Sequence, residues 1–136
     1  MTDEATSMYE RVGGEATFRA LVHEFYRGVA GDPLLRPLYP EEDLGPAEER
    51  LALFLIQYWG GPHTYGEQRG HPRLRMRHAP FRIDTAARDR WLTHMSAAME
   101  AVAATGVLTK PDAEEIWAYM VSAAQFMVNA ADLPES

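Results

Sequence analysis

His71-Pro72-Arg73-Leu74-Arg75-Met76-Arg77-His78-Ala79-Pro80-Phe81-Arg82-Ile83 is the most informative stretch of this chain. Its two prolines limit any helix to residues 73–79, about two turns, because proline cannot continue a helix and disfavours helical backbone in the residue before it. A helix this short is marginal alone in water, so another part of the molecule must hold it. One face of this helix and its exit would carry Leu74, Arg77, His78 and Phe81.

The side chains of this stretch allow two interpretations. An inward imidazole could bind a metal, and the neighbouring arginines would suit an anionic partner. A haem has both features, an iron that takes an axial histidine and two carboxylates. The alternative is a solvated basic turn with one core histidine. The stretch alone favours this alternative, because short motifs often match by chance.

The composition excludes several classes of protein. The chain has 136 residues, enough for one domain with a real core, and 46% of them are hydrophobic. No apolar run approaches the length of a membrane span. The absence of cysteine excludes disulfides, thiolate metal sites, thiol catalysis and thioether-attached haem. The formal net charge of −7 argues against nucleic acid as a partner. The acidic N-terminus does not resemble a secretory signal, so we expect a cytoplasmic protein.

Helical periodicity dominates the rest of the chain, and no segment shows the alternation of a strand. The predicted fold class is therefore all-α, with a single domain over 8–129 between a disordered tail (1–7) and a frayed tail (130–136). Glycines and prolines occur throughout 60–72 without an apolar period, so we expect a loop without helix there. Asp84 and Thr109 are predicted helix caps. Four long helices are predicted, at 15–30, 46–59, 85–104 and 110–129, with one helical turn at 8–12.

The absence of several sequence motifs excludes most common kinds of chemical site. The chain has no phosphate-binding glycine loop, no H-E-x-x-H and no Glu-x-x-His signature. What remains is His78 and three large donors at inward positions, Tyr26, Tyr39 and Trp91. Burying such groups costs free energy unless they are paired. Three of them suggest one shared polar ligand inside an apolar pocket, and bound dioxygen is a ligand that accepts hydrogen bonds.

Several motifs, in order and at matching spacing, resemble those of the truncated haemoglobins. Together with Trp91 they are similar to the second group of that family, the O-type of actinobacteria. The resemblance covers about residues 8–128 and favours the haem interpretation of His78. The motifs are Val12-Gly13-Gly14 with Phe18, Phe25-Tyr26, Leu38-Tyr39-Pro40, Ala47-Glu48-Glu49-Arg50-Leu51, Tyr58-Trp59-Gly60-Gly61-Pro62 and residues 71–83.

The resemblance implies a truncated globin, a two-over-two helical sandwich around haem b. It makes His78 the proximal iron ligand. It makes Tyr26, Tyr39 and Trp91 the distal donors around the bound ligand. Ala47 stands where many globins place a distal histidine, and its small side chain would leave that gate open.

Further contacts with the haem follow from the same resemblance. Leu51 and Phe54 would pack on its distal side. Arg77 is the first choice as partner of a propionate. Tyr65, His71 and Arg73 are further candidates for that contact. The proximal side or the haem edge would be lined by Leu74, Met76 and Phe81.

The function implied is reversible, high-affinity binding of dioxygen and of other diatomic ligands such as carbon monoxide and nitric oxide. Hydrogen bonds from Trp91 and one tyrosine, at about 1.5–3 kcal/mol each, would slow ligand release roughly 100-fold or more. Such slow release suits bulk oxygen transport poorly. Two alternatives stay open: a haem enzyme that turns over peroxide or nitric oxide, and an apo helical module that binds a protein. Whether Tyr26 or Tyr39 donates, whether the chain forms a homo-oligomer, and which reductase serves it also stay open.

Overall fold

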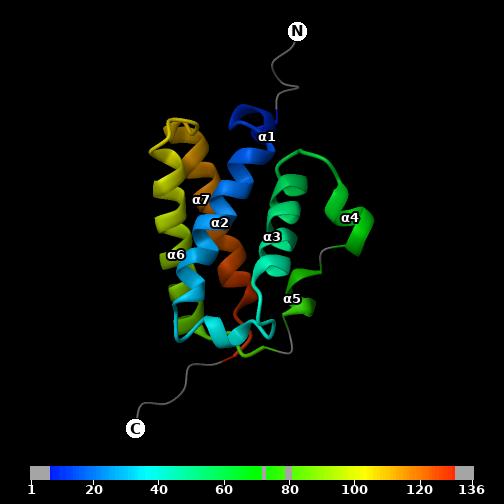
Figure 1. Ribbon diagram of the computed structural model, residues 1–136, viewed down its shortest axis with the longest axis vertical. Coiled ribbons are helices and arrows are strands. Elements are labelled where there is room, and N and C mark those ends of the chain that lie inside the picture. The colour runs from blue at the N-terminus through cyan, green and yellow to red at the C-terminus, as the bar shows by residue number, and fades with distance from the viewer. Residues whose placement is uncertain (1–6, 72, 79–80, 131–136) are drawn as a thin grey trace.

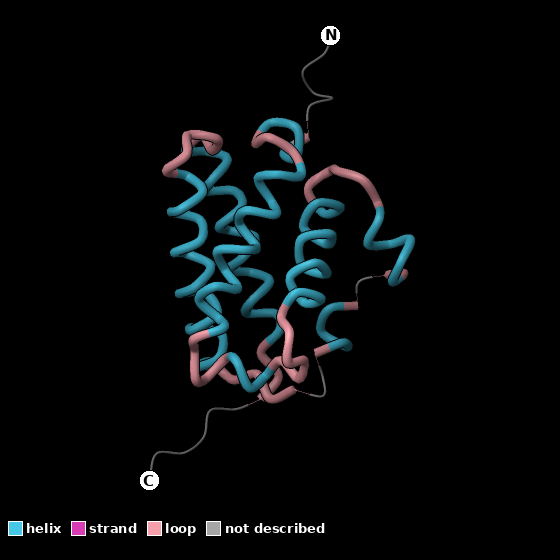
Figure 2. Tube along the Cα trace, viewed as in Figure 1, coloured by secondary structure: helices cyan, strands magenta, loops and turns pink. Residues whose placement is uncertain are grey.

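The computed structural model describes residues 7–71, 73–78 and 81–130, and every regular element in these ranges is helical (Figure 2). The all-α prediction is confirmed. None of the described helices is both long and apolar enough to cross a membrane. The elements are α1 (Met8–Arg11), α2 (Glu15–Ala30), the 3-10 helix η2 (Arg36–Leu38), α3 (Gly45–Tyr58), α4 (Thr64–Arg69), α5 (Leu74–Arg77), α6 (Thr85–Ala103) and α7 (Lys110–Met127).

Two antiparallel pairs of helices form the body of the molecule. Figure 1 shows α2 beside α3 and α6 beside α7, and the two pairs meet where α2 packs against α6. The segment with α4 and α5 leaves the end of α3 and returns along the outside of this body. The arrangement is the two-over-two sandwich expected from the sequence.

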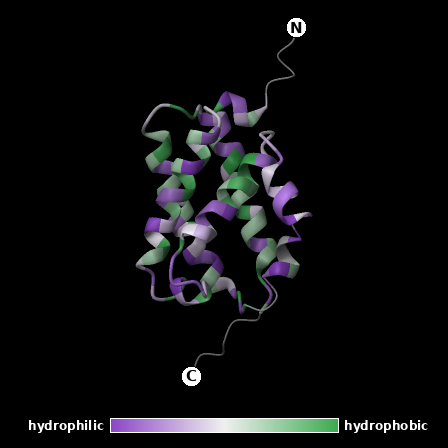
Figure 3. Cartoon of the chain, turned by 45° about the vertical axis from the view of Figure 1, so that its right-hand side comes forward, coloured by the Kyte–Doolittle hydropathy of each residue, from purple (hydrophilic) through white to green (hydrophobic). Residues whose placement is uncertain are grey.

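The core lies between the two pairs and consists of the apolar stripes of the long helices. Each long helix carries hydrophobic residues along part of its surface and hydrophilic residues along the rest (Figure 3). Phe18, Phe25 and Met95 are completely buried. Burying side chains of this size contributes about 1.5–3 kcal/mol each relative to exposure, so the stripes determine how the helices pack. The buried stripe of α2 consists of Phe18, Leu21, Val22, Phe25, Tyr26 and Val29.

Side-chain caps define where several helices begin. The Asp84 carboxylate accepts a hydrogen bond from the backbone N–H of Ala87, and the Thr109 hydroxyl accepts one from Asp112. Both caps were predicted. Ser7 forms a capping box with Glu10 at the start of α1. Apart from Ser7 and Ala130, the predicted tails lie outside the described residues.

The prediction that residues 60–72 contain no helix is wrong, because Thr64–Arg69 form α4. A contact with α3 explains the difference. The side-chain oxygen of Gln57 accepts a hydrogen bond from the backbone N–H of Gly66 at 2.7 Å, and the Tyr65 side chain is buried. Long-range packing of this kind overrides the weak helix propensity of the segment.

The helix in the most informative stretch is also shorter than predicted. α5 spans only Leu74–Arg77, a single turn. Arg73 has a φ of 45° and so cannot belong to it. Ala79, the predicted last residue, lies outside the described residues.

Replacing Met95 by alanine tests the packing of α2 on α6. We expect the free energy of unfolding to fall by about 2–5 kcal/mol, because the fully buried side chain leaves a cavity. Urea unfolding of the purified protein measures this change. The matched control is Thr93→Ala on the exposed side of the same helix, which should shift stability by less than about 0.5 kcal/mol. Equal shifts in the two variants would contradict this description of the core.

Candidate functional site

A cavity of about 420 Å³ lies between the helix pairs and the α4–α5 segment. Its volume falls within the roughly 300–1,000 Å³ typical of small-molecule and cofactor sites. Every long helix contributes to its wall. The lining residues are Tyr26, Leu35, Leu38, Tyr39, Pro40, Glu41, Ala47, Arg50, Leu51, Phe54, Leu55, Tyr65, Arg69, Arg77, His78, Phe81, Ile83, Ala87, Arg88, Trp91, Tyr119, Met120, Ala123, Ala124 and Met127.

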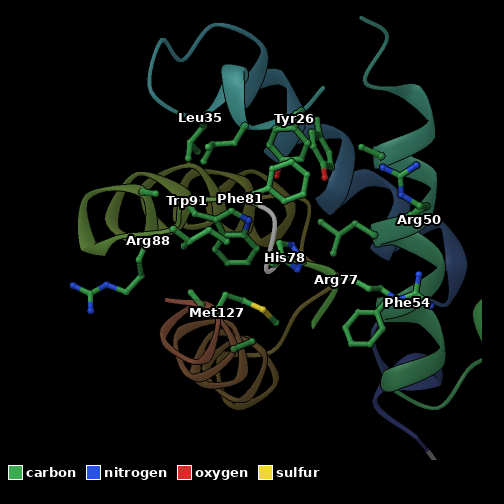
Figure 4. A pocket seen from close by; sticks show the side chains of 18 of the residues that line it. Tyr26, Leu35, Arg50, Phe54, Arg77, His78, Phe81, Arg88, Trp91 and Met127 are labelled. Carbon is green, nitrogen blue, oxygen red and sulfur yellow. The ribbon is translucent and has the colours of Figure 1, made fainter. Parts of the chain in front are cut away.

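His78 follows directly after α5, and its half-buried side chain lines the cavity. Figure 4 shows it near Phe81 and Trp91, with Tyr26 and Met127 on either side in this view. The structure thus places the predicted imidazole in the same cavity as apolar and aromatic side chains. His78 therefore faces inward, as both interpretations of this stretch expect.

Asn129 holds the backbone around His78. Its side-chain N–H group donates to the carbonyl oxygens of His78 at 3.2 Å and of Phe81 at 2.9 Å. Its side-chain oxygen accepts from the backbone N–H of Ile83 at 2.9 Å. One amide thereby fixes the exit from the His78 turn. Asn129 was not among the predicted site residues, because an asparagine at the end of a helix has no periodic signal.

Tyr26, Tyr39 and Trp91 meet at the same cavity, although they come from α2, the corner after η2 and α6. The rings of Tyr26 and Tyr39 lie edge to face, with centroids 5.5 Å apart. The Trp91 ring packs against Phe25 of α2, with centroids 5.0 Å apart. The structure therefore brings together the three donors that the sequence analysis selected.

Burial raises the pKa of both cavity tyrosines far above the usual value for a phenol. For Tyr26 the electrostatic influence of Tyr39 raises the pKa further. For Tyr39 the Tyr26 hydroxyl and Arg50 oppose the effect of burial without cancelling it. Both phenols consequently keep their protons at neutral pH and can donate hydrogen bonds.

Ala47, Leu51 and Phe54 of α3 and Tyr65 of α4 also line the cavity, as predicted positions for cofactor or ligand contacts. The three residues of α3 lie together because successive turns of one helix place residues three and four apart on the same side. Arg50 was not a predicted site residue, yet it lines the same cavity and forms an ion pair of 2.7 Å with Glu41.

Arg77 reaches the cavity wall, and its guanidinium also donates to the carbonyl oxygens of Arg69 at 2.8 Å and His71 at 3.4 Å. Arg69 and Arg88 line the cavity too, although the sequence analysis did not select them. Arginine is common on surfaces, so its sequence position alone does not indicate which copies face a pocket.

Three candidates lie away from the cavity among the described residues. His71 and Arg73 are exposed, and Met76 is 65% exposed. Arg73 stands outside the one-turn helix α5, and Met76 lies on the solvent side of that turn. The side chain of Leu74 lies outside the described part of the structure.

The acidic and imidazole groups also limit how a metal could be held. Within residues 7–71, 73–78 and 81–130, no group of three histidine, cysteine, aspartate or glutamate side chains could bind a metal ion.

Comparison with known proteins agrees with this geometry. The family model of the bacterial-like globins matches residues 7–129. The chain belongs to the bacterial-like globins, as a truncated haemoglobin of the second group. The group 2 truncated haemoglobin YjbI of Bacillus subtilis is 40% identical to it over 124 residues, which are 91% of this chain and 89% of the relative.

Solved globin structures share the fold as well. A thermostable haemoglobin from the actinobacterium Thermobifida fusca has a TM-score of 0.88 and 62% identity, covering 92% of this globin and 98% of that chain. An oxygen-avid truncated haemoglobin from Bacillus subtilis has a TM-score of 0.82 and 40% identity, covering 91% and 100%. The recognised family and its two-over-two fold are thereby confirmed.

Membership in this family implies haem b as the cofactor and oxygen binding as the function. The cavity of this globin fits such a group. Its wall is largely aliphatic and aromatic, as a porphyrin requires. It contains one imidazole suited to iron and arginines suited to carboxylates, together with phenol and indole donors.

The raised pKa values predict how stability depends on pH. Unfolded tyrosines ionise near pH 10, whereas Tyr26 and Tyr39 keep their protons in the folded globin. The unfolded state then binds fewer protons, so the free energy of unfolding should fall as pH rises above about 10. Urea unfolding of the apoprotein between about pH 9 and 11 measures the loss, and Tyr26→Phe combined with Tyr39→Phe should remove most of it.

Tyr119→Phe is the matched control for this measurement. Burial, followed by the influence of Tyr58, raises the pKa of Tyr119 to about 12, so this single substitution should remove about half as much of the loss as the double variant does. An unchanged loss in the double variant would contradict the assignment to Tyr26 and Tyr39.

Proposed function

We propose that this globin binds dioxygen reversibly and with high affinity, with His78 as the axial ligand of the haem iron. The observation that supports this is the meeting of one imidazole and three hydrogen-bond donors in one cavity, from four separate parts of the chain. When bound, the haem would supply an iron that can bind a diatomic gas, and His78 would provide an imidazole to hold that iron.

The task of His78 is to present a neutral imidazole nitrogen in a fixed direction. The hydrogen bonds from Asn129 to the carbonyls of His78 and Phe81 support this role, because they restrain the backbone at those two residues. Arg77 is our first choice for the partner of a haem carboxylate. It lines the cavity and is already held by two backbone carbonyls.

The task of Trp91 and the tyrosines is to donate hydrogen bonds to the gas. Their raised pKa values keep Tyr26 and Tyr39 protonated, and the indole N–H of Trp91 is a donor at every pH. Hydrogen bonds to an acceptor that carries charge are worth about 1.5–3 kcal/mol each. Slow release and high affinity follow. The oxygen-avid character given to the 40%-identical Bacillus subtilis structure supports the same conclusion.

Ala47 has the task of leaving room. Its buried methyl group lines the cavity at the start of α3 and offers no hydrogen bond. The polar contacts of a bound gas would therefore come from α2, α6 and the corner after η2.

Replacing His78 by alanine tests the proposed ligand. We expect the purified variant to lose its haem, because the iron then lacks its bond to the protein. The visible absorption spectrum of the reduced protein, before and after carbon monoxide, measures this through the Soret band. His23→Ala is the control, since His23 is exposed on α2 and bonds only Glu48 in the described structure. A variant at His78 with an unaltered spectrum would refute the assignment.

Replacing Trp91 by phenylalanine tests the proposed hydrogen bond. We expect dioxygen to dissociate about 10- to 100-fold faster, which corresponds to losing one hydrogen bond to a charged acceptor. Stopped-flow displacement of oxygen by carbon monoxide gives the rate. The control is Trp117→Phe on α7, because Trp117 is not among the described residues that line the cavity. Equal rates for the wild type and Trp91→Phe would rule out this role of the indole.

A further inference from the structure

A completely buried carboxylate lies just beyond the end of α2. The side chain of Asp32 has no exposed surface, and both of its oxygens accept hydrogen bonds. Burial alone would raise its pKa, but hydrogen bonds from His94, Leu34, Leu35 and Arg90 outweigh burial and hold the pKa well below the usual range. Asp32 is thus a buried charge that its surroundings fully satisfy.

The two oxygens of Asp32 bind two different parts of the globin. Oδ1 accepts from the backbone N–H groups of Leu34 at 2.8 Å and Leu35 at 3.2 Å, which orders the corner leading to Tyr39. Oδ2 accepts from Arg90 Nε at 3.0 Å and Nη2 at 2.9 Å. It also lies 2.6 Å from His94 Nε2. Because a carboxylate only accepts, that nitrogen carries the hydrogen.

The α6 partners of Asp32 flank Trp91 in the sequence. Arg90 precedes Trp91, and His94 follows it by three residues, which is almost one helical turn. Oδ2 therefore binds α6 at two residues, one before and one after Trp91 in the sequence. The Trp91 ring itself packs on Phe25 of α2, so the same two helices meet at the indole and at the carboxylate.

Gly28 makes the close approach of His94 to α2 feasible. A Cβ atom at residue 28 would overlap Nδ1 of the His94 ring. The imidazole thus lies directly against the α2 backbone, with one nitrogen over Gly28 and the other on Asp32. Any larger side chain at residue 28 would push His94 away from the carboxylate.

We infer that Asp32 is a positioning residue for the hydrogen bond from Trp91 to the bound ligand. It sets the rotation and the axial position of α6 relative to α2, and with them the direction of the indole N–H. The strength of a hydrogen bond falls steeply with angle and distance, so a small displacement of α6 weakens it. This inference rests on the proposed function of Trp91 and adds a residue outside the cavity wall.

Asp32→Asn tests the inference in the haem-loaded protein. The asparagine keeps one oxygen for Leu34 and Leu35, while its amide N–H group now faces the donors of Arg90 and His94. We expect dioxygen to dissociate several-fold faster, although less so than in Trp91→Phe. We also expect the infrared C–O stretch of the carbon monoxide complex to shift, because it responds to hydrogen bonds on the ligand.

A double-mutant cycle with Trp91→Phe identifies the route of the effect. If Asp32 acts through the indole, Asp32→Asn should change the release rate no further in the Trp91→Phe background. Additive effects on the rate would overturn the inference. A Trp91→Phe variant with the wild-type rate would instead refute the proposed role of Trp91, so the two failures are distinguishable.

Asp112→Asn provides the matched control. Asp112 is also buried and forms an ion pair with Arg11 at 3.2 Å, but it joins α1 to α7, away from the donors. This variant should lower stability while it leaves the release rate and the C–O stretch unchanged. If both aspartate variants change the rate equally, the effect is one of general stability and the inference is wrong.

Gly28→Ala is a second variant in case Asp32→Asn does not fold. Alanine is a better helix former than glycine, so α2 should persist. The added methyl group displaces His94 from Asp32 without altering the carboxylate. We expect the same direction of change in the release rate and the C–O stretch, and wild-type values for both would overturn the inference.

Discussion

The packing of α2 against α6 is the contact on which the rest of this globin depends. It buries Phe25 and Met95 completely, and so contributes a large share of the core. The residue after Phe25 is Tyr26, which faces the cavity, while Phe25 itself packs on Trp91. One helix interface thereby stabilises the fold and places two aromatic side chains of the cavity wall, Tyr26 and Trp91.

Local pattern explains how much of the fold could be predicted. The stripe of α2 and the caps Asp84 and Thr109 depend on residues close together in the sequence, so periodicity and cap chemistry reveal them. α4 depends on Gln57 of another helix, which a local pattern does not contain. The cavity residues were selected by inward spacing together with family resemblance, and neither of these indicated that Met76 faces solvent.

The polar residues that organise the site were the hardest to find in the sequence. Asp32 stands before a proline and resembles an ordinary helix stop, yet its partner His94 lies 62 residues later. The surface ion pair between Arg19 and Glu49 would look equally informative in the sequence, although exposed pairs of this kind contribute little stability. Burial separates the two cases, and burial is a property of the assembled fold.

The hydrogen bonds of the Asn129 side chain also set an order of events in biosynthesis. Asn129 holds backbone that precedes it by 46 to 51 residues, so the wall around His78 is complete only once Asn129 itself has been translated. The side chains of Tyr26, Tyr39 and Trp91, on another part of the cavity wall, all leave the ribosome earlier. A nascent chain can therefore assemble the side of the cavity that carries the tyrosines and the indole while the turn that carries His78 is still unsecured, which makes closure of the cavity a late step in maturation.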